Sequence, residues 1–167
     1  ISLWSGPRYT PSQPNALLLR GADGNFKVRD GACVEDTAST RGALAGDIDG
    51  DGCLDLITVA LNGPVRVLHN LCTAGNTWLS VSLNAKGANR RAVGAVVELS
   101  DDGATQRRAV LAGSQSVFSA LPVRVHFGLG KAASESTTRS LSVRWPGGKV
   151  TKHAVPLANR HLVLAQP

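Results

Sequence analysis

The chain lacks methionine, has few aromatic residues and carries none of the common catalytic or nucleotide-binding signatures. Phe, Trp and Tyr make up 4% of its 167 residues, so a core must be built mainly from Val, Leu and Ala. No CxxC or CxxCH pattern occurs, which excludes the usual zinc, dithiol and haem-attachment motifs. HExxH, P-loop, Rossmann and GxSxG patterns are also absent, so we assign no catalytic residue and predict a protein that is not an enzyme.

Long apolar runs and aromatic-rich basic stripes are missing as well. No segment approaches the roughly 20 apolar residues of a membrane-spanning helix. No basic stripe with interleaved aromatics indicates a nucleic-acid partner. The sequence begins at Ile1 rather than Met, so we expect a processed or partial chain, in agreement with a removed secretory signal. These features favour a secreted or periplasmic location.

Three cysteines, Cys33, Cys53 and Cys72, leave the redox state open. An odd number permits one disulfide, in any of three pairings, with one free or intermolecular thiol. Three unpaired buried thiols fit the sequence equally well. An extracellular compartment would allow the disulfide to form and persist.

The net charge of +6 is distributed unevenly along the chain. Residues 1–77 carry six Lys or Arg and eight Asp or Glu, whereas residues 78–167 carry twelve and four. The basic second part could meet an acidic glycan, an anionic surface or an acidic partner. Its arginines are scattered along expected strands and turns, which favours a solvated basic surface over a binding site.

The strongest positive feature is an acidic, glycine-rich stretch. Four carboxylates follow one another at short intervals, with Gly50 and Gly52 between them: Asp47, Asp49, Asp51 and Asp55. Calcium binds six to eight oxygens and would relieve the repulsion between these carboxylates. The spacing resembles the first half of an EF-hand loop, with the backbone carbonyl of Cys53 at the seventh position. Thr58 replaces the final Glu of that loop, so we expect Asp55 to complete the calcium site.

Short apolar segments flank this stretch. Residues 42–46 and 56–61 have neither the length nor the period of a helix, so we expect a strand, a calcium loop and a second strand. The alternative is an acidic turn that binds only water, because Asp and Gly are common turn residues.

The pattern of the remaining sequence also predicts short strands separated by Gly and Asp turns, and therefore an all-β fold. The expected strands are 16–20, 42–47, 55–61, 65–69, 78–84, 93–99, 106–112, 123–129, 140–145, 149–155 and 160–165. Leu141, Val143 and Trp145 share one face of their strand, as in two antiparallel sheets packed together. We therefore expect a C-terminal antiparallel β-sandwich.

Several motifs have ordinary structural explanations. His126 alternates with the apolar Val125 and Phe127, so we expect a histidine on a strand surface. Trp145 begins a Trp-Pro-Gly-Gly turn, and we expect it to anchor the core. The stretch 89–91, Asn-Arg-Arg, precedes a strand and is expected to shape a loop.

Two parts of the sequence resemble known families. Residues 15–70 resemble a VCBS/FG-GAP repeat in the pieces 15–20 (NALLLR), 21–26 (GADGNF), 41–52 (RGALAGDIDGDG) and 67–70 (VLHN). Residues 76–150 resemble the ASPIC/UnbV domain of cartilage acidic protein-like proteins. The pieces are 76–79 (NTWL), 89–95 (NRRAVGA), 113–114 (GS), 126–130 (HFGLG) and 143–148 (VRWPGG).

The resemblance implies a division into a Pro-rich arm (1–14), a calcium-binding repeat (15–71) and a β-sandwich (76–167). It also implies a secreted, calcium-binding, adhesive protein whose repeat belongs to a β-propeller. One repeat cannot bury its own apolar faces, so we expect another chain or the missing remainder of a propeller to cover it. The alternative is a carbohydrate-binding module or an enzyme acting on acidic polysaccharide, but no paired carboxylates occur outside the acidic stretch.

Overall fold

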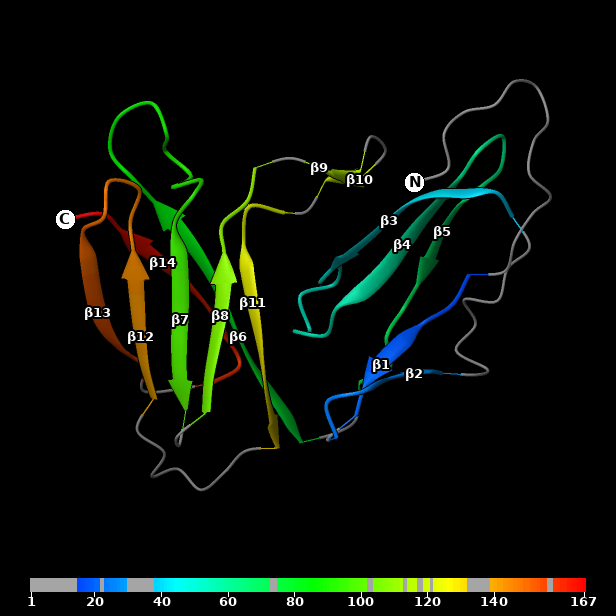
Figure 1. Ribbon diagram of the computed structural model, residues 1–167, viewed down its shortest axis with the longest axis horizontal. Helices are drawn as coiled ribbons and strands as arrows, with labels where there is room; N and C mark the ends of the chain where they lie inside the picture. Colours follow the sequence, from blue (N-terminus) through cyan, green and yellow to red (C-terminus); the bar gives the residue numbers. More distant parts are fainter. Residues whose placement is uncertain are drawn as a thin grey trace.

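The computed structural model describes residues 15–21, 23–29, 38–72, 75–101, 104–112, 114–116, 119–120, 122–131, 139–155 and 158–167. These residues form strands and turns, and none of them lies in a helix, so no helix of the described chain could cross a membrane. The predicted all-β fold is confirmed (Figure 1). The expected arm at 1–14 and Cys33 lie outside the described residues.

Strands β1 to β5 form two small sheets in the N-terminal part. Their bounds are β1 Leu18–Arg20, β2 Phe26–Val28, β3 Thr40–Gly46, β4 Asp55–Ala60 and β5 Val65–Leu68. The first two strands form a hairpin, and β3-β4-β5 form an antiparallel sheet. The hairpin between β4 and β5 turns at Asn62, which has a positive φ of 53°. The predicted strand, acidic loop and strand correspond to β3, residues 47–54 and β4.

The remaining strands form the C-terminal part. Their bounds are β6 Asn76–Asn84, β7 Val96–Asp101, β8 Ala104–Ala109, β9 Ser114–Ser116, β10 Ser119–Ala120, β11 Val125–Lys131, β12 Arg139–Arg144, β13 Val150–Val155 and β14 Arg160–Ala165. A sheet ordered β11-β6-β14 faces a sheet ordered β13-β12-β7-β8. The expected antiparallel pairing holds except at β14, which runs parallel to β6.

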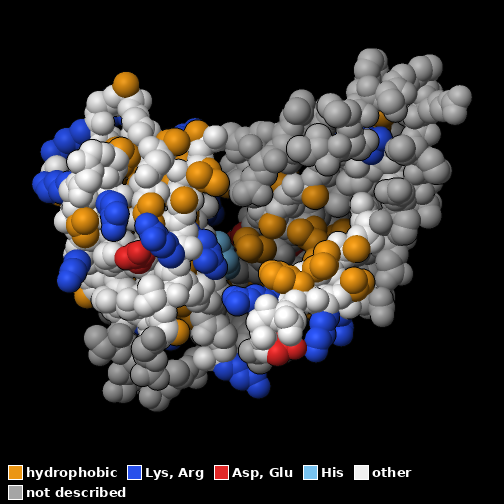
Figure 2. All heavy atoms as spheres, in the orientation of Figure 1, with side chains coloured by type: hydrophobic (Ala, Val, Ile, Leu, Met, Phe, Trp, Pro, Cys, Tyr) orange, Lys and Arg blue, Asp and Glu red, His pale blue; other side chains and the backbone are white. Residues whose placement is uncertain are grey.

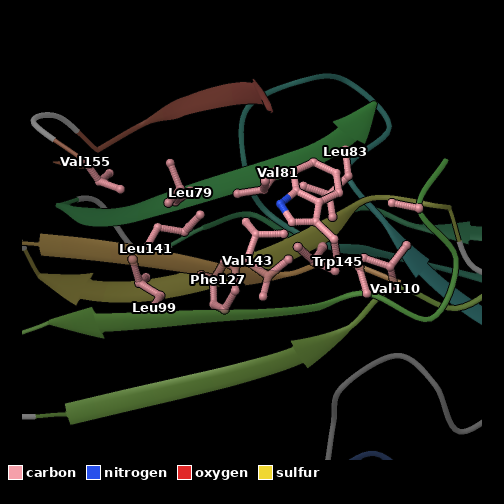
Figure 3. Packing of buried hydrophobic residues seen from close by; sticks show 14 of the residues in the cluster. Leu79, Val81, Leu83, Leu99, Val110, Phe127, Leu141, Val143, Trp145 and Val155 are labelled. Atoms are coloured by element: carbon pink, nitrogen blue, oxygen red, sulfur yellow. The ribbon is translucent and has the colours of Figure 1, made fainter. Parts of the chain in front are cut away.

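The core lies between these two sheets, as the alternation predicts. Leu79 and Val81 of β6 are fully buried, and so are Leu141 and Val143 of β12. Trp145 is 1% exposed and confirms the expected core anchor. Figure 3 shows its ring among side chains contributed by both sheets. At about 25 cal/mol per Å² of apolar surface, such burial is the main stabilising contribution to the sandwich.

Some strand boundaries differ from those expected, for local reasons. The strand expected at 93–99 begins only at Val96, because Ala92 and Gly94 have positive φ and lie in a turn. Asn89 shapes this turn as expected, since its side chain bonds both the backbone N–H and the carbonyl of Val93 at 2.9 Å. The strands β2, β9 and β10 were not predicted, because two or three residues are too few to show an alternation.

Candidate metal centre

The acidic loop, residues 47–54, connects the ends of β3 and β4. Gly46 lies opposite Asp55 in the register of these strands, so the loop begins and ends at neighbouring positions. Gly50 and Gly52 have φ values of 82° and 91°, which residues with side chains rarely adopt. The alternation of Asp and Gly therefore permits a tight turn in which a carboxylate occurs at every second residue.

Backbone N–H groups of the loop hold three of its carboxylates. Asp47 accepts bonds from the N–H groups of Gly50 at 2.8 Å and Gly52 at 3.2 Å. Asp49 accepts a bond from Asp51 N–H at 3.2 Å, and Asp51 accepts one from Cys53 N–H at 2.7 Å. These are the local side-chain bonds that Asp commonly makes in turns. They define the conformation of the loop through local contacts.

Asp55 lies at the base of the loop and is 1% exposed. Its two oxygens accept bonds from the N–H groups of Asn70 at 2.9 Å and Ile48 at 3.1 Å. These bonds, first that of Asn70 and then that of Ile48, lower the pKa of Asp55 because they favour the charged carboxylate. Asp55 therefore ties the end of β5 to the start of the acidic loop.

His69 is a member of this site that the sequence analysis missed. Its Nε2 lies 3.0 Å from Oδ2 of Asp49 and 4.0 Å from Oδ1 of Asp55. The antiparallel register pairs Leu68 with Leu56, which brings the next residue beside Asp55. The Asn-Gly turn at 62–63 was the signal that could have predicted this position, because a tight hairpin fixes the register of its strands.

The structure brings together part of the predicted ligand set. Ligand atoms of Asp49, Asp51 and His69 all lie within 4.8 Å of one another, and all three residues are exposed. Asp47 and Asp55 stand outside this group, and their oxygens accept backbone N–H bonds instead. Carboxylate oxygens fit a hard cation such as calcium, whereas the imidazole of His69 is more typical of a transition-metal ligand. The carboxylates alone therefore fit calcium, with His69 placed to orient Asp49.

A disulfide links Cys53, at the end of the acidic loop, to Cys72 beyond β5. The sequence left three pairings and the fully reduced state open, and the structure contains this pairing. The bond joins the loop to the segment that leads into β6. It therefore restrains the loop relative to the first strand of the sandwich.

The acidic loop rests against the sandwich at Trp78, on the outer face of β6. A Cβ at position 52 would overlap the indole ring at Nε1, Cε2 and Cδ1, so the backbone of Gly52 lies directly against the ring. Trp78 stacks on His126 of β11, with ring centroids 6.0 Å apart and planes 15° apart. The contact joins the acidic loop to the outer face of the sandwich.

His126 lies on the outer face of β11, opposite the buried Val125 and Phe127, as the alternation predicts. The ring is half-buried because of its stacking on Trp78. Burial lowers the pKa of His126, and the charge of Arg108 lowers it further, whereas the charge of Asp47 opposes the shift. The histidine is therefore held mainly neutral near pH 7, between the acidic loop and an arginine of the sandwich.

Comparisons with known proteins find a family match in the C-terminal part. Residues 85–167 match the family described as ASPIC and UnbV. "Cartilage acidic protein 1" of Homo sapiens is 29% identical over 165 residues, which cover 93% of this chain and 24% of the relative. The Mus musculus protein of that name is 28% identical over 165 residues, covering 93% and 25%. The Xenopus tropicalis protein is 34% identical over 128 residues, covering 74% and 19%.

The chain thus spans about a quarter of the length of the two mammalian relatives. The ASPIC/UnbV part of the sequence-based resemblance is confirmed. The VCBS/FG-GAP assignment of residues 15–70 stays a prediction.

Proposed function

We propose that this chain is a non-catalytic, extracytoplasmic interaction module whose acidic loop is stabilised by calcium. The observation that carries the proposal is the clustering of exposed ligand atoms of Asp49 and Asp51, on the acidic loop, next to His69, which follows β5. The cysteine pair supports the compartment, because structural disulfides persist mainly outside the cytoplasm. The similarity to cartilage acidic protein 1 agrees with an extracellular setting.

Calcium would act on structure rather than on chemistry. Asp49 and Asp51 would supply the exposed oxygens. The lone pairs that the backbone N–H bonds leave free on Asp47 and Asp55 would complete the shell with the Cys53 carbonyl, and the bound charge would offset the mutual repulsion of the carboxylates. Because Gly52 of this loop rests on Trp78, an ordered loop would also fix the N-terminal sheets against the sandwich.

A catalytic role on acidic polysaccharide has less support. In the described part of the sandwich, Glu98 and Asp101 are ion-paired, with Arg107 at 3.4 Å and Arg139 at 3.1 Å. Glycosidases use a pair of carboxyl groups that face each other across the substrate bond. The described carboxylates of the sandwich are therefore engaged with arginines rather than arranged as such a pair.

Removing calcium is expected to lower the thermal midpoint of the N-terminal sheets. A ligand at 100 times its dissociation constant stabilises the folded state by about 2.7 kcal/mol, and EDTA removes that contribution. Calorimetry should give a higher thermal midpoint with calcium than with EDTA for the natural chain. The double variant Asp49→Ala/Asp51→Ala should give the same midpoint under both conditions.

The matched control is Asp23→Ala. Asp23 accepts a bond from Asn25 N–H at 3.1 Å in an exposed turn, as the loop carboxylates do, but lies outside the cluster. It should keep the full response to EDTA. Equal midpoints of the natural chain with calcium and with EDTA would exclude a calcium-stabilised loop, and replacement of calcium by Zn²⁺ at far lower concentration would assign the site to a transition metal.

The partner is expected to cover the N-terminal sheets. Val65 and Val67 of β5 are 62% and 58% exposed, and Phe26 of β2 is 65% exposed. Figure 2 shows hydrophobic side chains gathered over these sheets. Soluble monomers rarely leave large contiguous apolar patches open to water, so such a surface indicates a protein contact, either another chain or further blades of a propeller.

This surface predicts self-association of the isolated chain. Sedimentation velocity should show a mass that rises with concentration, and Val67→Lys should suppress the rise because it places a charge in the contact. Val163→Lys, at a 65% exposed site on β14 of the sandwich, is the matched control and should leave association unchanged. A chain that stays monomeric at all concentrations, or a loss of association in both variants, would contradict the proposed surface.

A further inference from the structure

A cleft lies between the acidic loop and strands β8 and β11, separate from the cluster of Asp49, Asp51 and His69. Its volume is about 460 Å³, within the range of roughly 300–1,000 Å³ typical of small-molecule sites. Figure 2 shows the molecule hollowed here, with histidine, basic and hydrophobic side chains around the hollow. The wall of the cleft therefore contains both basic and apolar groups.

Apolar side chains form one part of the cleft wall. Leu54 comes from the acidic loop, Leu111 follows β8, and Pro122 precedes β11. Leu54 and Leu111 are 37% and 50% exposed, so each retains surface that a ligand could cover. Covering apolar surface stabilises a complex by about 25 cal/mol per Å², which favours a ligand with a hydrocarbon body.

The basic part of the wall contains Arg108 and Arg124. Neither arginine has an ion-pair partner among the residues that the structure describes. Among the described residues, the guanidinium of Arg108 donates to uncharged oxygens, the carbonyl of Arg107 at 3.0 Å and Oε1 of Gln106 at 3.1 Å, and it lies 5.5 Å from the centroid of the Phe127 ring. Two guanidinium groups without carboxylates can bind a carboxylate or sulfonate through charge-assisted hydrogen bonds.

The one acidic residue among the described residues of the cleft wall competes only weakly with a ligand for the two arginines. Asp47 also lines it, but both of its oxygens already accept bonds from the N–H groups of Gly50 and Gly52. His126 also lines the cleft, near Arg108. The cleft therefore carries a net positive charge from its arginines, next to an apolar wall.

We propose that this cleft binds a small amphipathic carboxylate, with its acid group on Arg108 and Arg124 and its hydrocarbon body on Leu54, Leu111 and Pro122. The cleft shares Asp47 and Leu54 with the acidic loop, but the arginines that would bind the acid group belong to the sandwich. It gives the chain a ligand-binding capacity in addition to its proposed role as an interaction module.

Octanoate is a suitable probe because it combines one carboxylate with an aliphatic chain. Titration of the ¹⁵N-labelled chain should shift the backbone amides of Leu54, Leu111 and His126. Octanol and octylamine share the chain but lack the negative charge, and sulfate has the charge without the chain. Each should bind at least about tenfold more weakly, because each loses either the charged hydrogen bonds or the apolar contact.

The double variant Arg108→Gln/Arg124→Gln should weaken octanoate binding by at least about tenfold. The chain should stay folded because both side chains are exposed, although the variant gives up the contact of Arg108 over the Phe127 ring. Arg144→Gln is the matched control, because Arg144 is an exposed strand arginine outside the cleft and should leave affinity unchanged. The loss caused by the double variant should appear both with calcium and with EDTA, so a failed calcium site and a failed cleft are distinguishable.

Two results would overturn the proposal. The first is octanol binding as tightly as octanoate, or equal losses in the cleft and control variants, since either would show unspecific adsorption. The second is a capped peptide of alternating Leu and Asp that binds at least about tenfold more tightly than octanoate. That outcome would assign the cleft to a segment of a partner protein rather than to a small molecule.

Discussion

Adding one methyl group at position 52 is expected to detach the acidic loop from the sandwich. Gly52 has a φ of 91°, and its Cβ would overlap the indole of Trp78. Strained backbone and overpacking each cost roughly 1–3 kcal/mol. Gly52→Ala should therefore lower the stability of the N-terminal sheets and increase hydrogen exchange across residues 47–55, while the exchange of the buried sandwich strands stays unchanged.

Gly50→Ala is the matched control for this prediction. Gly50 has a similar φ of 82°, but no atom lies within 4 Å of the position its Cβ would take. Gly50→Ala should therefore lose only the free energy of stability that a positive φ costs a residue with a side chain. A second test is a double-mutant cycle, because in a Trp78→Ala background Gly52→Ala should cost no more than Gly50→Ala. Equal effects of the two glycine variants in the natural background would contradict the contact with Trp78.

The acidic loop was predictable from sequence because its geometry is local. Asp47 to Asp51 bond to backbone N–H groups no more than five residues away, and the glycines supply the positive φ values that these bonds require. The alternation of Leu141, Val143 and Trp145 was equally informative, since a period of two places the side chains of a strand on opposite faces.

The rest of the site depends on contacts between distant segments. His69 approaches Asp49 only because the register of β4 and β5 brings it there, and Trp78 meets Gly52 across two separate sheets. The pairing of Cys53 with Cys72 follows from the same folding, so the cysteine spacing alone could not select it. The cleft combines a loop residue with arginines more than 50 positions later, and no local pattern indicates that meeting.

Replacing Trp145 with Ala is expected to destabilise the whole sandwich by about 3–5 kcal/mol, the usual cost of removing a buried Trp or Phe side chain. The ring is 1% exposed within the core, and its Nε1 donates a bond to Oγ1 of Thr151 at 2.9 Å. Chemical denaturation followed by far-UV circular dichroism measures the loss of free energy of unfolding.

Trp145→Phe separates packing from hydrogen bonding. Phe keeps most of the apolar ring and removes the N–H donor, while Thr151 retains its contact with Nε2 of His153 at 2.9 Å. This variant should therefore lose clearly less stability than Trp145→Ala, and equal losses would mean that the cavity contributes little. Strand β6 links the core to the acidic loop, because Leu79 packs in the core and its neighbour Trp78 contacts the loop from the outer face. Trp145→Ala should therefore also weaken the contact with the acidic loop. Gly52→Ala, in contrast, should leave the core intact.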